Sequence, residues 1–159
     1  SLNEGILRLD STGGSIRTSK TYDNFELGLE FKLPPKNNTG VFLRGRYEVQ
    51  LIDPQFKTKD GKALKPKEKC GGIYGLMAPT KDAYKGSNKW NSLNIKLIGN
   101  IVTVKMNDVV VIDAKPIEEV TVGALDDNES DPGPIMIHAH ASVGQEFRNI
   151  RIKKIPKED

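Results

Sequence analysis

Apolar and polar residues alternate with a period of two through nearly the whole of this 159-residue chain. The clearest case is residues 25–33, FELGLEFKL, in which every second residue is apolar. Because successive side chains of a strand point to opposite faces, this pattern predicts strands with one buried face. No helical spacing is sustained along the chain, so we expect an all-β fold.

Similar runs recur at close spacing, and glycine, asparagine and proline separate them. The expected strands are 6–9, 15–18, 25–33, 40–44, 47–52, 72–77, 92–98, 101–106, 109–112, 135–140 and 147–155. Gly99-Asn100 and Asn107-Asp108 predict two tight hairpin turns in series, because these residues readily adopt positive φ. Many short strands of this kind predict two antiparallel sheets packed face to face as a jelly-roll sandwich. A closed barrel is the alternative.

Length and composition are typical of one globular domain spanning residues 1–159. The chain is 36% hydrophobic and 28% charged, with a formal charge of +3, as in an ordinary folded protein. No nucleic-acid-binding motif accompanies the lysine-rich residues 57–69, so no nucleic-acid partner is expected. No apolar run reaches the length of about 18 residues that spans a membrane, and the first residues do not form an export signal. Cys70 is the only cysteine, which excludes an internal disulfide.

The stretch GVFLRGRYEVQLID, residues 40–53, predicts a hairpin with an unusually polar face. A loop formed by residues 45–47 would pair Arg44 with Glu48 and Phe42 with Gln50, leaving a coherent apolar side toward the core. One interpretation of the polar side is a solvated ion pair between Arg44 and Glu48. The other is a saccharide-binding face, because sugars need hydrogen-bond donors, acceptors and an apolar surface.

His138 and His140 are the only histidines, and period two places both on one face of the expected strand 135–140. A metal site would need a third ligand, which the sequence does not identify, so we expect no metal and no other cofactor. Hydrogen bonding or proton transfer on a polar face and a purely structural role both remain open for this pair.

Five sequence blocks occur in an order that is typical of a known family. They are TYDNFELGLEFKLPPKNNTGVFLRGRYEVQLID, CGGIYGLMAP, KWNSLNIKLIGNIVTVKMNDVVVID, PGPIMIHAHASVGQ and EFRNIRI, and they cover about residues 4–155. In these blocks the chain resembles the 3-keto-disaccharide hydrolase domain family. The resemblance implies a concanavalin A-like jelly-roll sandwich.

The family pattern of an Asn-Ser/Thr-Gly turn, a strand ending in Arg, and Tyr-Glu-Val-Gln followed by Asp has counterparts throughout the hairpin. They are Asn38, Thr39, Gly40, Arg44, Tyr47, Glu48, Gln50 and Asp53. The chain departs from the family pattern in one strand, where His138 stands in place of a typical Gln and Ala139 in place of an acidic residue. His140 keeps the histidine of that strand.

The resemblance implies cleavage of 3-keto-glycosides, in which a sugar C3 ketone acidifies the C2 hydrogen so that a base can remove it and the C1 substituent can leave. It implies catalytic roles for Arg44, Glu48 and His140, with Arg44 stabilising the enolate. It implies that Phe42, Gln50, Asp53 and His138 bind the substrate, although Asp53 is out of phase with Glu48 along the strand.

The implied partner is a saccharide, with no nucleic acid and no membrane, and the resemblance favours an exported bacterial protein. Two other classes remain open. One is a noncatalytic carbohydrate-binding module, because the same polar face would suit a lectin-like site, and the other is a scaffold domain with no sugar ligand.

Overall fold

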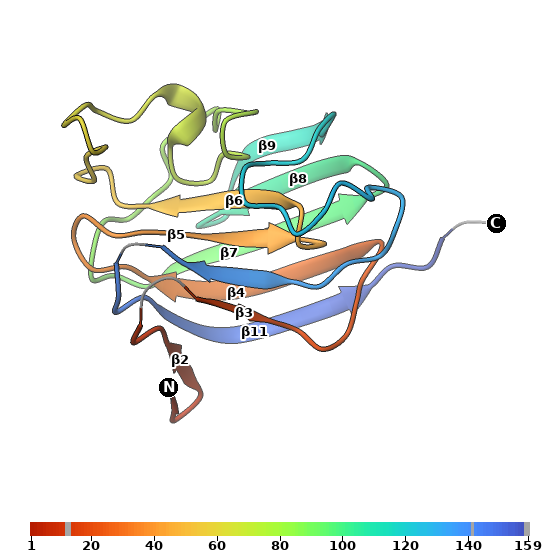
Figure 1. The fold of residues 1–159 in the computed structure, drawn as a ribbon, viewed down its shortest axis with the longest axis horizontal. Helices are drawn as coiled ribbons and strands as arrows, with labels where there is room; N and C mark the ends of the chain where they lie inside the picture. The colour runs from red at the N-terminus through yellow and green to blue at the C-terminus, as the bar shows by residue number, and fades with distance from the viewer. Residues whose placement is uncertain (12–13, 141, 158–159) are drawn as a thin grey trace.

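The computed structural model describes residues 1–11, 14–140 and 142–157, and its strands form two antiparallel sheets that face each other (Figure 1). The seven-stranded sheet has the order β1 (Leu2–Asn3), β2 (Ile6–Arg8), β11 (Glu146–Lys154), β4 (Phe25–Lys32), β7 (Asn91–Ile98), β8 (Ile101–Met106) and β9 (Val109–Pro116). The four-stranded sheet has the order β3 (Ser15–Arg17), β10 (Met136–Ala139), β5 (Asn38–Leu43) and β6 (Tyr47–Ile52). The predicted all-β jelly-roll sandwich is therefore confirmed.

Helical structure within the described ranges is limited to one 3-10 turn, η1 (Pro66–Glu68). None of the helical residues described there forms a segment that is long and apolar enough to cross a membrane.

The core lies between the sheets and is built from alternate residues of the facing strands. From β4, Phe25 and Phe31 are completely buried, and from the opposite sheet so are Val41 and Val49. Removing one large apolar side chain from water contributes roughly 1.5–3 kcal/mol, so the alternating pattern supplies much of the stabilisation. The same alternation turns every other residue of β5 and β6 away from the core.

The two predicted hairpins in the seven-stranded sheet are confirmed. Ile98 pairs with Ile101 across the first turn, and Met106 pairs with Val109 across the second. Positive φ angles occur where the turns need them, at Gly99 (56°), Asn107 (50°) and Asp108 (64°).

The prediction of a strand at residues 72–77 is wrong, because this segment makes only isolated bridges, from Ile73 to Val49 and to Met77. Gly71 and Gly75 have φ angles of 89° and 73°, which turn the chain back before a strand can extend. The segment instead bonds to the free edge of β6. The Tyr74 amide donates to the Glu48 carbonyl at 3.0 Å, and the Gln50 amide donates to the Gly72 carbonyl at 2.9 Å.

The segment between β9 and β10 passes the turn that joins β5 to β6 (Figure 1). The Arg46 guanidinium donates to the Asp126 carboxylate at 2.6 Å and to the Asp131 carbonyl at 2.7 Å. The Thr121 amide donates to the Arg46 carbonyl at 3.0 Å. These bonds place Val122 and Gly123 beside the outer face of the four-stranded sheet, where they line a small pocket.

Candidate functional site

The register of the hairpin β5–β6 decides which polar side chains can meet. Leu43 pairs with Tyr47 and Phe42 with Glu48, so the loop is formed by residues 44–46, and the expected pairing of Arg44 with Glu48 is wrong. The observed register buries Tyr47 in the core, whereas the expected one would leave it in the turn. The observed register is shifted by two residues from the expected one, and such a shift does not exchange the faces of a strand. Phe42, Glu48 and Gln50 therefore still lie on one face, as predicted.

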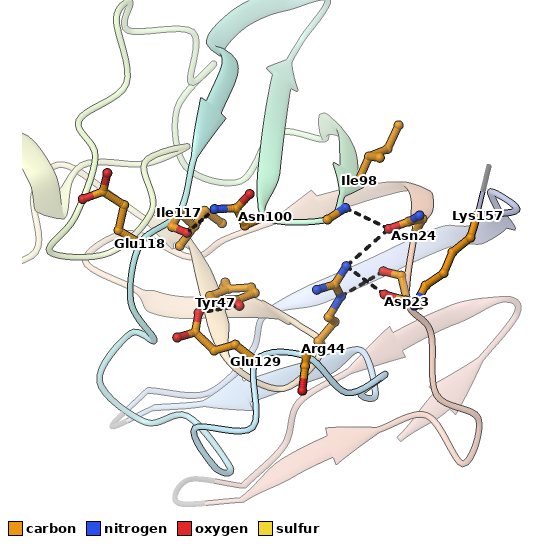
Figure 2. A pocket seen from close by; sticks show the side chains of 12 residues that line it. Asp23, Asn24, Arg44, Tyr47, Ile98, Asn100, Ile117, Glu118, Glu129 and Lys157 are labelled. Carbon is orange, nitrogen blue, oxygen red and sulfur yellow. Dashed lines mark hydrogen bonds and ion pairs between the residues drawn. The ribbon is translucent and has the colours of Figure 1, made fainter. Parts of the chain in front are cut away.

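Arg44 is the residue that this correction displaces. It occupies the turn with a φ angle of 54°, and its side chain points toward Asp23 and Asn24 at the end of the sandwich (Figure 2). There the guanidinium forms an ion pair with Asp23 at 3.2 Å and donates to the Asp23 carbonyl at 2.9 Å. Arg44 therefore lines an end pocket between the two sheets, which shares no lining residue with the pocket beside Glu48.

The outer face of the four-stranded sheet carries two rows of residues that run across its strands. Gly40 lies between His138 of β10 and Gln50 of β6, and Phe42 lies between Met136 and Glu48. We call the hollow above these rows the outer pocket. Its volume is about 170 Å³, and its lining residues are Asn38, Phe42, Glu48, Gln50, Tyr74, Val122, Gly123, His138 and His140.

Glu48 is the central ionisable group of the outer pocket. Its side chain is 8% exposed, and burial raises the pKa of its carboxyl to about 8. Within the described chain, no charged group or side-chain hydrogen bond offsets that burial. The carboxyl lies over Gly40, where any Cβ atom would overlap it. Glu48 and His138 line the outer pocket from β6 and β10, the strands on either side of β5.

His138 has the opposite shift. Burial, followed by the charge of His140, lowers the pKa of its imidazole. Nδ1 lies 3.1 Å from the Ser15 hydroxyl on β3, and the ring meets Phe42 edge to face with centroids 6.3 Å apart. His140 is exposed, and its ring centroid lies 5.6 Å from that of His138. The outer pocket is thus lined by both a neutral imidazole and a protonated carboxyl near neutral pH.

Two further side chains supply polar atoms to the outer pocket. Gln50 is 2% exposed, and its buried Oε1 has no hydrogen-bond partner among the described residues. Tyr74 contributes its phenol, whose pKa is raised chiefly by burial, so the hydroxyl stays a donor at neutral pH. The sequence pattern missed Tyr74 because it predicted a strand at 72–77, and nothing in that pattern indicates that the segment returns to the edge of β6.

Asp53 lies outside both pockets, although the family pattern implies that it binds substrate. Its carboxylate accepts hydrogen bonds from the backbone amides of Lys36 at 3.1 Å and Gln55 at 3.0 Å, and from the Tyr84 hydroxyl at 3.5 Å. It follows the last residue of β6, out of phase with Glu48, so it ties loops together instead of facing the outer pocket.

The described residues contain no group of three or more His, Cys, Asp or Glu side chains arranged to hold a metal ion. The chemistry that the outer pocket offers by itself is proton transfer, through Glu48 and His138, together with hydrogen bonding from neutral amides and a phenol.

Comparison with known proteins places this sandwich among carbohydrate-related domains. The chain belongs to the family of 3-keto-α-glucoside-1,2-lyase-like domains, whose model matches residues 1–153. No curated protein sequence matches the chain.

Solved structures give the same fold. A candidate glycosyl hydrolase from Parabacteroides distasonis ATCC 8503 is 25% identical with a TM-score of 0.82, over 98% of this chain and 74% of that one. A second from the same organism is 27% identical with a TM-score of 0.77, over 98% and 89% of the two chains. The carbohydrate-binding module CBM66 from Bacillus subtilis is 13% identical with a TM-score of 0.52, over 94% and 96%, and shares the fold alone. The expected concanavalin A-like fold is confirmed.

Proposed function

We propose that this domain cleaves 3-keto-glycosides in the outer pocket. The observation that carries the proposal is that Glu48 and His138 line the same pocket and have pKa values shifted in opposite directions. Pairs of titratable groups whose environments separate their pKa values are suited to act as acid and base at one pH. The family and the similarity to candidate glycosyl hydrolases support the same reaction class.

The reaction needs two proton transfers and no strong nucleophile. A C3 ketone makes the C2 hydrogen acidic, so a base removes that proton and an enolate forms. The electron pair then forms the C1–C2 double bond while the C1–O bond breaks, and the departing oxygen takes a proton from an acid. Water adds at C1 and a proton returns to C2, so the products are a 3-keto-monosaccharide and the released alcohol.

His138 takes the C2 proton in this proposal, because its lowered pKa keeps the imidazole neutral at neutral pH. Glu48 protonates the leaving oxygen, because a carboxyl with a pKa of about 8 is roughly nine-tenths protonated at pH 7. Gly40 makes room for the Glu48 carboxyl itself, because that carboxyl occupies the space where a Cβ atom would lie.

The enolate oxygen needs donors that are already in place before the reaction. The amide of Gln50 and the hydroxyl of Tyr74 line the outer pocket and replace Arg44, which lies in the end pocket, in that role. His140, exposed at the mouth, exchanges the proton of His138 with solvent. A volume of about 170 Å³ is below the roughly 300–1,000 Å³ of drug-sized sites, so one sugar ring enters and the leaving group stays at the mouth.

The test is incubation of the protein with 3-keto-disaccharides in D₂O, with monosaccharide release and deuterium at C2 followed together. Elimination requires both signals, since the returning proton comes from solvent. Glu48→Gln should lose both signals, and Glu26→Gln is its matched control, because Glu26 is an exposed carboxylate on the seven-stranded sheet. If the folded protein binds the keto-sugar without release or exchange, the domain is a carbohydrate-binding module and not an enzyme. If it does not bind the keto-sugar at all, the scaffold domain is the class that is left.

A further inference from the structure

The end pocket around Arg44 is larger than the outer pocket, with a volume of about 840 Å³ (Figure 2). It lies where the β5–β6 turn meets the start of β4 and the β7–β8 turn. Its polar lining includes Asp23, Arg44, Tyr47, Asn100, Glu118 and Glu129. Strand β6 separates it from the outer pocket, because Tyr47 faces the interior between the sheets and Glu48 faces outward.

Arg44 forms the floor of the end pocket with a guanidinium that is only partly paired. The side chain is 3% exposed, and its Nε and Nη2 atoms are used by Asp23 and Asn24. In the part of the chain that the structure describes, Nη1 has no protein acceptor, and Figure 2 draws no interaction from it. Asp23 in turn shares its charge with Lys157, whose Nζ lies 2.7 Å from Oδ2. An unpaired N–H donor that lines a pocket can bond to an incoming acceptor.

The walls of the end pocket supply acceptors and an apolar surface. The Tyr47 hydroxyl donates to Glu129 at 2.7 Å, and burial raises the pKa of this phenol to about 12, so it keeps its proton and retains a free lone pair. Glu118 is an exposed carboxylate at the rim. Ile98, 41% exposed, presents an apolar side chain to the same space. This combination of donor, acceptors and apolar wall matches the hydroxyl and C–H surfaces of a sugar.

We infer that the end pocket is a second saccharide-binding site, separate from the proposed catalytic pocket. Its occupant is a neutral oligosaccharide, because three carboxylates, on Asp23, Glu118 and Glu129, face two cations and would repel an acidic sugar. The volume falls within the range of roughly 300–1,000 Å³ that holds ligands larger than one ring. The site would retain a glycan chain whether or not the outer pocket acts on it.

The test is titration of the ¹⁵N-labelled full chain with neutral trisaccharides of glucose, galactose and fructose, with trigalacturonate as the acidic comparison. We expect amide signals of Gly99, Asn100 and Ser130 to move with a neutral trisaccharide while those of Tyr74 and Gly123 stay in place. No movement at the end pocket with any of the neutral sugars would overturn the inference. Stronger binding of trigalacturonate would do the same.

A matched pair of variants gives an independent readout that does not require Arg44 to be replaced. Glu118→Ala removes a carboxylate of the rim, and Glu119→Ala removes its exposed neighbour, which does not line the pocket. We expect Glu118→Ala to lower the affinity for the trisaccharide about tenfold, as for loss of one charged hydrogen bond. We expect Glu119→Ala to leave this affinity unchanged. Equal affinities of the two variants would argue against the site. Turnover of 3-keto-disaccharides is measured separately, so failure of either idea is distinguishable.

Discussion

The outer pocket and the end pocket lie on opposite sides of strand β6, and each is organised around one buried ionisable side chain. Glu48 in the outer pocket has no compensating charge, and burial alone raises the pKa of its carboxyl to about 8. Arg44 in the end pocket is buried even more deeply, yet it is paired with Asp23 and bonded to Asn24. The two regions therefore differ in whether the surrounding protein neutralises the buried group.

This difference separates a group that can move a proton from one that can hold a ligand. An isolated buried carboxyl changes its protonation state near neutral pH, which is what acid catalysis needs. A paired guanidinium keeps its charge. Burial lowers the pKa of Arg44, and the charge of Asp23 opposes that shift. Arg44 is thus an anchor, and Glu48 is the group to test first.

The largest effect is expected from Glu48→Gln. The substitution keeps the shape of the side chain but removes its acid, and a general acid contributes about 10²- to 10⁴-fold to a rate. We expect release of monosaccharide from 3-keto-disaccharides to fall by that factor with the substrate affinity retained. The steady-state rate and KM measure both. A variant that keeps its full rate would remove Glu48 from the reaction.

The second effect concerns stability and pH. Because the folded-state pKa of Glu48 is above its ordinary value of 4.5, the folded protein holds this proton more tightly than the unfolded chain. Its contribution to stability is fully present below pH 4.5 and is lost as the pH rises through about 8. At about 1.4 kcal/mol per pH unit, the loss between pH 4.5 and about 8 is on the order of 5 kcal/mol.

Glu48→Gln isolates this contribution, since the amide does not titrate. We expect the variant to gain stability relative to the parent as the pH is raised from about 5 to 8, measured by urea unfolding at several pH values. Parallel stability curves for the two proteins would mean that Glu48 is already neutralised by a partner, and the contrast with Arg44 would be lost.

A smaller effect, now on the other pocket, is expected from Arg44→Met. Breaking a buried ion pair costs about 3–5 kcal/mol, but Asp23 keeps Lys157 as a partner, so we expect a loss of about 2 kcal/mol in the free energy of unfolding. Turnover per folded molecule should be unchanged, because Arg44 does not line the outer pocket. Arg151→Met, an exposed arginine of the seven-stranded sheet, is the control. Loss of turnover beyond the loss of folded protein would return Arg44 to the catalytic machinery.

Local pattern predicted most of the fold because alternation and turn chemistry are themselves local. The faces of β4, β5 and β6 and both turns of the β7–β8–β9 meander follow from period two and from residues that accept positive φ. The apolar pattern of residues 72–77 wrongly predicts a strand, because period two does not register the chain reversal at Gly71 and Gly75.

The alternation of side chains along a strand predicted which residues of the candidate site share a face, and nothing more. Phe42, Glu48, Gln50 and His138 share a face for that reason. The positions of Arg44 and Tyr74 depend on where a turn closes and on which edge a loop covers. Those outcomes are set by burial of Tyr47 and by tertiary hydrogen bonds, and period two carries no information on either.

The smallest effect is expected from His140→Ala. This variant tests whether His138 and His140 have different roles, as Glu48 and Arg44 do. His140 is exposed at the mouth of the outer pocket, whereas His138 is partly buried and lies beside the Ser15 hydroxyl. A group that only exchanges a proton with solvent is readily replaced by water or buffer, so we expect a rate loss below about tenfold, rescued by added imidazole. His138→Ala should lose far more of the rate. Its pH profile should also lack the rise in activity that reports a group with a pKa below the ordinary value of 6.5. If His140→Ala instead shows the large rate loss and the altered pH profile of kcat/KM, the base is His140, and the partly buried His138 serves to orient it.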